Sequence, residues 1–71
     1  MMLQLCYQTH RGAGVVKSLH ECELEATLKR MYQARIKCRV YYAGLPRTDE
    51  AALVGEVGEH PDGFLMWWCN A

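Results

Sequence analysis

The residue types that most often carry out chemistry are present in this chain, but they are scattered. The four cysteines form no C-x-x-C pair and lie at Cys6, Cys22, Cys38 and Cys69. Isolated cysteines in a reducing compartment are mostly small buried hydrophobic residues. One H-x-C triplet, His20-Glu21-Cys22, lacks the paired spacing of a structural zinc site. The sequence therefore predicts neither a metal site nor a disulfide framework.

No catalytic group or cofactor loop can be placed from the sequence. Gly12 and Gly14 lie two residues apart, but the third glycine or the Lys-Ser/Thr of a phosphate-binding loop is missing. Nothing positions a cysteine beside a histidine, and no pair of carboxylates is brought together by its spacing. We therefore expect that the protein is not an enzyme, needs no cofactor and acts by binding.

The charge is balanced over the whole chain but unevenly placed along it. Eight Lys and Arg residues match eight Asp and Glu residues, so the net charge is zero. One basic stretch contains no acid and comprises Lys29, Arg30, Arg35, Lys37, Arg39 and Arg47. Acids flank it on both sides, as in a helix with complemented ends followed by solvated loops. The second interpretation is a basic patch, although zero net charge argues against a protein that mainly holds nucleic-acid phosphates.

A helix is the clearest predicted element. Ser18 followed by Glu21 has the pattern of a capping box, which places the start of the helix at Ser18. Four apolar residues beyond it share one helical stripe: Leu24, Leu28, Met31 and Tyr32. Arg35 is next on that stripe, so it either extends its charge outward or marks the end of the helix.

The other segments predict strands. Residues 2–8 alternate as a half-buried strand should, and Val15–Val16 is expected to pair only briefly against them. Residues 36–43, 52–59 and 64–70 follow the helix, and the turn His60-Pro61-Asp62-Gly63 closes the last two into a hairpin. We expect a single α+β domain over residues 1–71, with one helix packed on a three- to four-stranded, mainly antiparallel sheet. The element order is strand, helix and three strands.

The hairpin turn also assigns side chains to the two faces of the sheet. With a glycine bulge at Gly63, Val57 lies opposite Trp67 and Glu56 lies opposite Trp68. The residues predicted beneath the helix are Leu53, Val57, Leu65, Trp67 and Cys69. The residues predicted on the uncovered face are Arg39, Tyr41, Phe64, Met66 and Trp68.

The last strand breaks a rule for antiparallel sheets, because it is apolar on both faces. A sheet face that meets water normally carries polar side chains, and an adjoining stripe of large apolar residues indicates an interaction site. We therefore predict that Arg39, Tyr41, Phe64, Met66 and Trp68 form a binding face that joins two copies into a homodimer. A further protein partner for the same assembly is left open.

Two alternatives remain at this point. Single-stranded nucleic acid would stack its bases on the rings while Lys37 and Arg39 hold phosphates, although Glu56 and the zero net charge oppose this. In the other alternative, the first strand or Val15–Val16 folds over the stripe, or the register is shifted by one residue, and the stripe is core.

No segment resembles a targeting signal or a membrane span. Residues 1–8 are apolar only in alternation, interrupted by Gln4 and Gln8. No apolar run approaches the roughly 18 residues that a membrane helix needs. We expect a cytoplasmic protein with no membrane contact.

Overall fold

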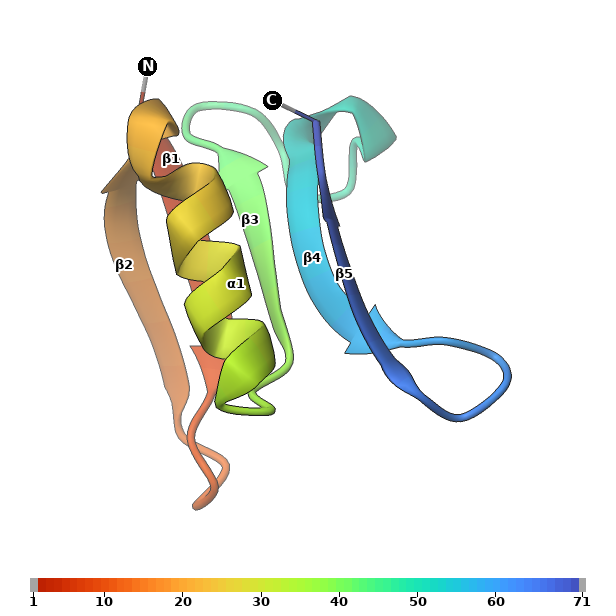
Figure 1. Cartoon of the computed structure of the whole chain (residues 1–71). Coiled ribbons are helices and arrows are strands. Elements are labelled where there is room, and N and C mark those ends of the chain that lie inside the picture. The colour runs from red at the N-terminus through yellow and green to blue at the C-terminus, as the bar shows by residue number, and fades with distance from the viewer. Residues whose placement is uncertain (1, 71) are drawn as a thin grey trace.

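The computed structural model describes residues 2–70 and shows one α-helix against a five-stranded antiparallel sheet (Figure 1). The strands are β1 (Met2–Gln8), β2 (Gly14–His20), β3 (Cys38–Tyr42), β4 (Leu53–Glu59) and β5 (Leu65–Cys69), and the helix is α1 (Leu24–Gln33). Two single turns of 3-10 helix, η1 (Glu21–Glu23) and η2 (Glu50–Ala52), precede α1 and β4. The order across the sheet is β2-β1-β3-β4-β5. The predicted α+β class is confirmed.

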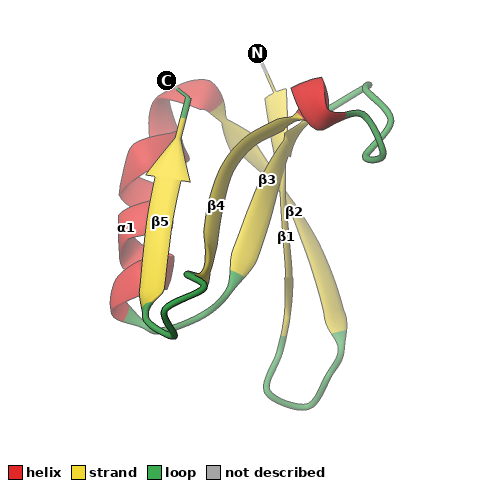
Figure 2. Cartoon of the chain, turned by 90° about the vertical axis from the view of Figure 1, so that its right-hand side faces the viewer, coloured by secondary structure: helices red, strands yellow, loops and turns green. Residues whose placement is uncertain are grey.

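The sheet has five strands, so the predicted count of three to four is wrong. The additional strand is β2, which pairs with β1 along its whole length. A tight turn reverses the chain between them, with the Thr9 N–H donating to the Ala13 oxygen at 2.9 Å and Gly12 at φ 83°. The segment containing Val15–Val16 therefore extends the sheet sideways and does not fold over its face (Figure 2). The sequence pattern missed β2 because this edge strand is mostly exposed to solvent. Its polar residues therefore hide the alternation of apolar and polar residues that marks a strand.

The helix begins later than the capping pattern predicted. Ser18 lies inside β2 and pairs with Gln4, so its backbone belongs to the sheet. The same type of contact forms two residues further on, where the His20 N–H donates to the Glu23 carboxylate at 3.2 Å. The η1 turn follows, and α1 begins only at Leu24.

The helix ends in a Schellman-type turn centred on Arg35. Arg35 has φ 58°, its N–H donates to the Tyr32 oxygen, and the Ile36 N–H donates to the Met31 oxygen, both at about 3 Å. Glycine usually occupies this left-handed position because a side chain there is strained. Of the two roles predicted for Arg35, the structure shows the second, because the helix ends there.

The core lies between α1 and the sheet. Leu24 and Leu28 are buried against a cluster that includes Leu3, Leu5, Val40 and Val57. Met31 is partly buried beside it, whereas Tyr32 is 38% exposed and Thr27 is buried. Tyr32 was therefore wrongly assigned to the buried stripe, because α1 packs mainly on β4 and β5 and turns that side of the helix outward.

A bulge between β3 and β4 changes one predicted face. The pairing shifts between Val40, opposite Gly55, and Tyr41, opposite Leu53. Leu53 therefore shares the face of Tyr41 instead of lying beneath the helix, and Val54 is buried in its place. The prediction for Leu53 assumed unbroken alternation, which a bulge interrupts.

Gly55 allows the helix to approach the sheet closely, and this gives a test of the packing. A Cβ atom at Gly55 would lie 2.6 Å from the Leu28 Cδ1 atom and 3.2 Å from the Trp68 carbonyl oxygen. We expect Gly55→Ala to lower the free energy of unfolding by about 1–3 kcal/mol in urea denaturation, because overfilled cores are strained. Gly14→Ala is the matched control, since a Cβ there meets nothing within 4 Å. Equal stability of the two variants would contradict the close approach.

Candidate binding surface

The β4–β5 hairpin has the predicted register. Gly63 has φ 93° and its N–H donates to the His60 oxygen, while the His60 N–H donates to the Phe64 oxygen, both at 2.8 Å. Glu56 lies opposite Trp68, and the partner of Met66 is Gly58. The alternative of a one-residue shift is therefore wrong, and Met66 and Trp68 lie on the face away from α1.

The neighbouring strands bring further residues to this face. Arg39 lies between Cys6 on β1 and Glu56 on β4, and Tyr41 lies beside Gln4. We call this surface the open face, and its central residues are Gln4, Cys6, Arg39, Tyr41, Glu56, Met66 and Trp68. Of the predicted binding residues, the structure therefore brings Arg39, Tyr41, Met66 and Trp68 onto one face.

Phe64 is placed apart from these four residues. It precedes the start of β5 and belongs to the hairpin turn, where its ring stacks on His60 with centroids 4.3 Å apart. Phe64 is 53% exposed, more than Met66 or Trp68, which are half-buried. Neither its own backbone nor another strand encloses it, so it remains a candidate contact at the end of the stripe.

Glu56 connects the two sides of the open face. One carboxylate oxygen accepts a hydrogen bond from the Arg39 Nε at 2.9 Å, and the other accepts one from the Trp68 indole Nε1 at 3.3 Å. The hydrogen bond to Glu56, followed by the proximity of Tyr41, raises the pKa of Arg39, which stays charged. The side chain of Glu56 is 26% exposed and that of Arg39 is 62% exposed, so solvent screens their attraction. The Glu56 carboxylate therefore bridges Arg39 and Trp68 across the open face.

A cation from a loop, the Arg47 guanidinium, lies over the Tyr41 ring. The Arg47 guanidinium lies 5.8 Å from the ring centroid, and its Nη2 donates to the Gln4 side chain at 3.3 Å. Such a cation contributes about 0.5–1 kcal/mol at an exposed site. No sequence signal pointed to this contact, because Arg47 belongs to the connection between β3 and η2.

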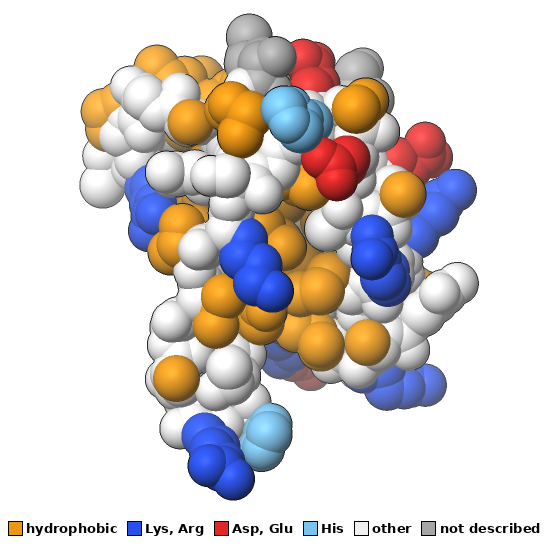
Figure 3. Space-filling model, turned by 90° about the vertical axis from the view of Figure 1, so that its left-hand side faces the viewer, with side chains coloured by type: hydrophobic (Ala, Val, Ile, Leu, Met, Phe, Trp, Pro, Cys, Tyr) orange, Lys and Arg blue, Asp and Glu red, His pale blue; other side chains and the backbone are white. Residues whose placement is uncertain are grey.

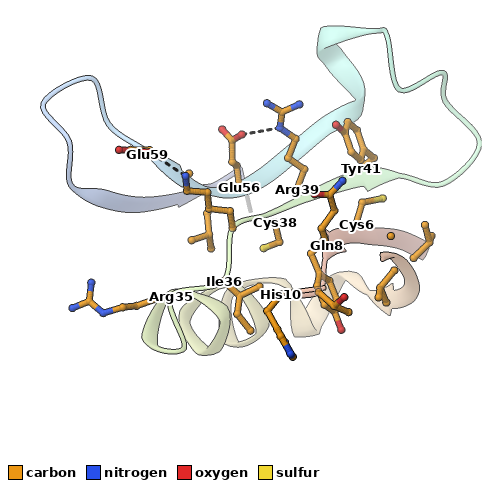
Figure 4. A pocket seen from close by; sticks show the side chains of 18 of the residues that line it. Cys6, Gln8, His10, Arg35, Ile36, Cys38, Arg39, Tyr41, Glu56 and Glu59 are labelled. Atoms are coloured by element: carbon orange, nitrogen blue, oxygen red, sulfur yellow. Dashed lines mark hydrogen bonds and ion pairs between the residues drawn. The ribbon is translucent and has the colours of Figure 1, made fainter. Parts of the chain in front are cut away.

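A broad hollow of about 1040 Å³ is lined by most of the open face, by the hairpin end of β1 and β2 and by the segment after α1 (Figure 4). Arg39, Tyr41 and Trp68 line it on the sheet, and Arg35 and Ile36 line it from the end of α1. Figure 3 shows hydrophobic atoms at the surface on the β2 side, where the helix does not cover the sheet. The hollow is wide and open, so it suits a macromolecular surface better than an enclosed small molecule.

Three of the six cations of the basic stretch pair with acids. Lys37 pairs with Glu59 at 3.0 Å and Arg39 pairs with Glu56 (Figure 4). Lys29 pairs with Glu25 one helical turn away at 3.4 Å. Arg30, Arg35 and Arg47 pair with no acid among the described residues, so the stretch keeps three cations without an ion-pair partner.

The remaining chemical groups show no assembled centre. All four cysteines are free thiols, and burial is the main cause that raises the pKa of Cys38 above its usual value. Within residues 2–70, no three His, Cys, Asp or Glu side chains lie close enough to hold a metal ion. No helix in this part of the chain is long and apolar enough to cross a membrane.

Comparisons of the chain with protein families, curated proteins and solved structures give no match. The function therefore has to be inferred from the open face itself.

The role of Glu56 can be tested by observing the two indole N–H groups separately. We expect Glu56→Ala to shift the Trp68 indole resonance in a ¹H–¹⁵N spectrum and to leave the Trp67 indole almost unchanged. The free energy of unfolding should fall by less than about 1 kcal/mol, because the Arg39 side chain is largely exposed and solvent screens its attraction to Glu56. Glu56→Gln keeps an acceptor for the indole, and Glu59→Ala is the control that touches only Lys37. Two unmoved indole signals in Glu56→Ala would rule out the hydrogen bond.

Proposed function

We propose that this chain is a non-enzymatic binding domain that self-associates through its open face and forms a homodimer. The observation that carries the proposal is the half-buried pair Met66 and Trp68, next to Tyr41, on a sheet face that no helix within residues 2–70 covers. Covering such side chains releases water from apolar surface, and a fully buried aromatic ring contributes about 1.5–3 kcal/mol.

The charges around the stripe support a second copy as the partner. Arg39 lies beside Glu56, and Lys37 lies beside Glu59, so cations and acids alternate near the rings. A two-fold contact brings the same patch of both copies together, and a patch with both signs can match itself by exchanging partners. A further protein partner would bind the assembled pair.

The proposed location is the cytoplasm. The four free thiols support it, because a reducing compartment keeps cysteines in this form. We also propose that the domain functions without a cofactor and without contact with a membrane.

Trp68→Lys tests the self-association directly. Position 68 lies opposite Glu56, so a lysine there can pair with the Glu56 carboxylate. An acidic residue at the same position would instead repel Glu56. We expect the dissociation constant of the dimer to rise by roughly 100-fold or more in sedimentation equilibrium, because each dimer loses two buried rings.

Tyr32→Lys is the matched control, since Tyr32 is an exposed aromatic residue on α1 and should leave the dimer intact. Circular dichroism of both variants shows that the fold is retained. A wild-type chain that stays monomeric at high concentration would refute the proposal, and so would a Trp68→Lys dimer as tight as the wild type.

A single-stranded nucleic-acid module is the second candidate. Two observations favour it: Arg47 lies over the Tyr41 ring, and Arg35 occupies a left-handed position at the rim of the hollow that would suit glycine better. We expect Arg35→Gly to raise the free energy of unfolding by about 0.5–1 kcal/mol. If the second candidate is right, the same change weakens binding of a labelled single strand, and salt releases the strand from the wild type. A wild type that ignores the strand at low salt removes this candidate.

A further inference from the structure

The outer edge of β5 has unused backbone hydrogen-bonding groups. β5 is the last strand of the sheet, and the hydrogen bonds at its two ends fix which residues face β4. The His60 N–H donates to the Phe64 oxygen, and the Asn70 N–H donates to the Val54 oxygen. Because bonded and non-bonded pairs alternate in an antiparallel ladder, Met66 and Trp68 bond to β4. The N–H and C=O groups that point outward belong to Leu65, Trp67 and Cys69.

Nothing in the composition of β5 protects this edge. The strand reads Leu-Met-Trp-Trp-Cys, with no charge, proline or glycine. Natural sheets usually protect an exposed edge with a lysine, a proline or a bulge, because a bare edge pairs with other strands. Within residues 2–70, no strand lies beyond β5 in the sheet, although α1 packs along the inner face of β5 and runs beside it in Figure 2.

The opposite edge of the same sheet is protected. β2 reads Gly-Val-Val-Lys-Ser-Leu-His and has Lys17 at its centre. If two β2 strands paired antiparallel about their centres, Lys17 of one copy would lie opposite Lys17 of the other. Like charges directly opposite one another destabilise a strand pair. Of the two edges, β5 alone lacks such a barrier.

We propose that β5 pairs antiparallel with β5 of a second copy, centred on Trp67, so that two five-stranded sheets join into one continuous sheet. This register places Leu65 opposite Cys69 of the second copy, Trp67 opposite its counterpart, and Cys69 opposite the second Leu65. A bonded antiparallel pair exchanges two hydrogen bonds, so the three facing pairs form about six in all.

The side chains of β5 are compatible with this pairing. On the open face, Met66 comes beside Trp68 of the second copy, and the two apolar stripes become one patch. On the helix side, the two Trp67 rings meet, and each has Lys29 at 5.8 Å from its centroid. The nearby Glu25 pairs with Lys29 and reduces the repulsion between the two lysines across the axis.

This contact differs from the proposed open-face contact in the direction of its symmetry axis. The two-fold axis of an edge pair stands perpendicular to the sheet, whereas the axis of a face-to-face pair lies between the two sheets. Perpendicular two-fold axes are compatible with a closed tetramer. The edge contact does not depend on the open-face contact, and each can fail without the other.

Residue-resolved amide hydrogen exchange over a dilution series tests the edge contact. We expect protection of the Leu65, Trp67 and Cys69 amides to rise by more than about tenfold with protein concentration, because each gains a hydrogen bond. The Met66 and Trp68 amides should be protected at every concentration. The outward amides of β2, at Val16 and Ser18, provide the internal control and should stay unprotected.

Tyr41→Lys separates this proposal from the proposed function, because Tyr41 lies on the open face but belongs to β3 and not to β5. If that variant loses the open-face contact, the outward β5 amides should still gain protection with concentration. The edge contact is overturned if the Leu65, Trp67 and Cys69 amides exchange as fast as those of Val16 and Ser18 in a sample that contains dimers. This holds even when the dimers form through the open face. A chain that is monomeric at every concentration overturns both.

A cross-link gives a second measurement of the register. Leu65→Cys places a thiol opposite Cys69 of the second copy, at about the 5.5 Å Cα spacing of a bonded pair, which a disulfide can span. Mild oxidation should give a covalent dimer that the variant combining Leu65→Cys with Cys69→Ser does not form. An equal yield of dimer from both variants, or none from the first, argues against the register.

Discussion

The arrangement of this protein depends on how little of the sheet one short helix can cover. α1 runs along the strands and is about 10 Å across, whereas five strands at their usual spacing are about 19 Å wide. The helix packs on β4 and β5 and leaves the whole opposite face bare, together with the hairpin ends of β1 and β2. Burial is therefore concentrated around Leu24, Leu28 and Val57. The remaining large apolar groups have to share surface with charged ones.

Sequence patterning predicted the parts of the fold that depend on local chemistry. Pro61 and Gly63 specified a turn, the turn specified a register, and the register placed Met66 and Trp68 on the correct face. The missed features depend on contacts distant in sequence. β2 is a polar edge strand, and the bulge that moves Leu53 depends on how β4 pairs with β3, although Gly55 lies beside it.

The same distinction applies to the candidate site. Tyr41, Met66 and Trp68 could be listed from alternation alone, and Glu56 could be placed opposite Trp68. The hydrogen bond from the indole to the carboxylate depends on side-chain geometry, which strand alternation does not specify. The position of Arg47 over Tyr41 depends on the course of a loop. The neutralisation of Lys37 and Arg39 likewise required the fold, because their acids lie about twenty residues further along the chain.

The hairpin that joins β1 to β2 has a practical consequence. Its tip, from Thr9 to Ala13, extends past the end of α1 and lies away from β5 (Figure 1). A Cβ atom at Gly12 or Gly14 would meet nothing within 4 Å. Exposed loop tips with small residues accept insertions well. A fluorescent tag or an epitope grafted at Gly12, which does not line the hollow, would therefore leave the fold intact.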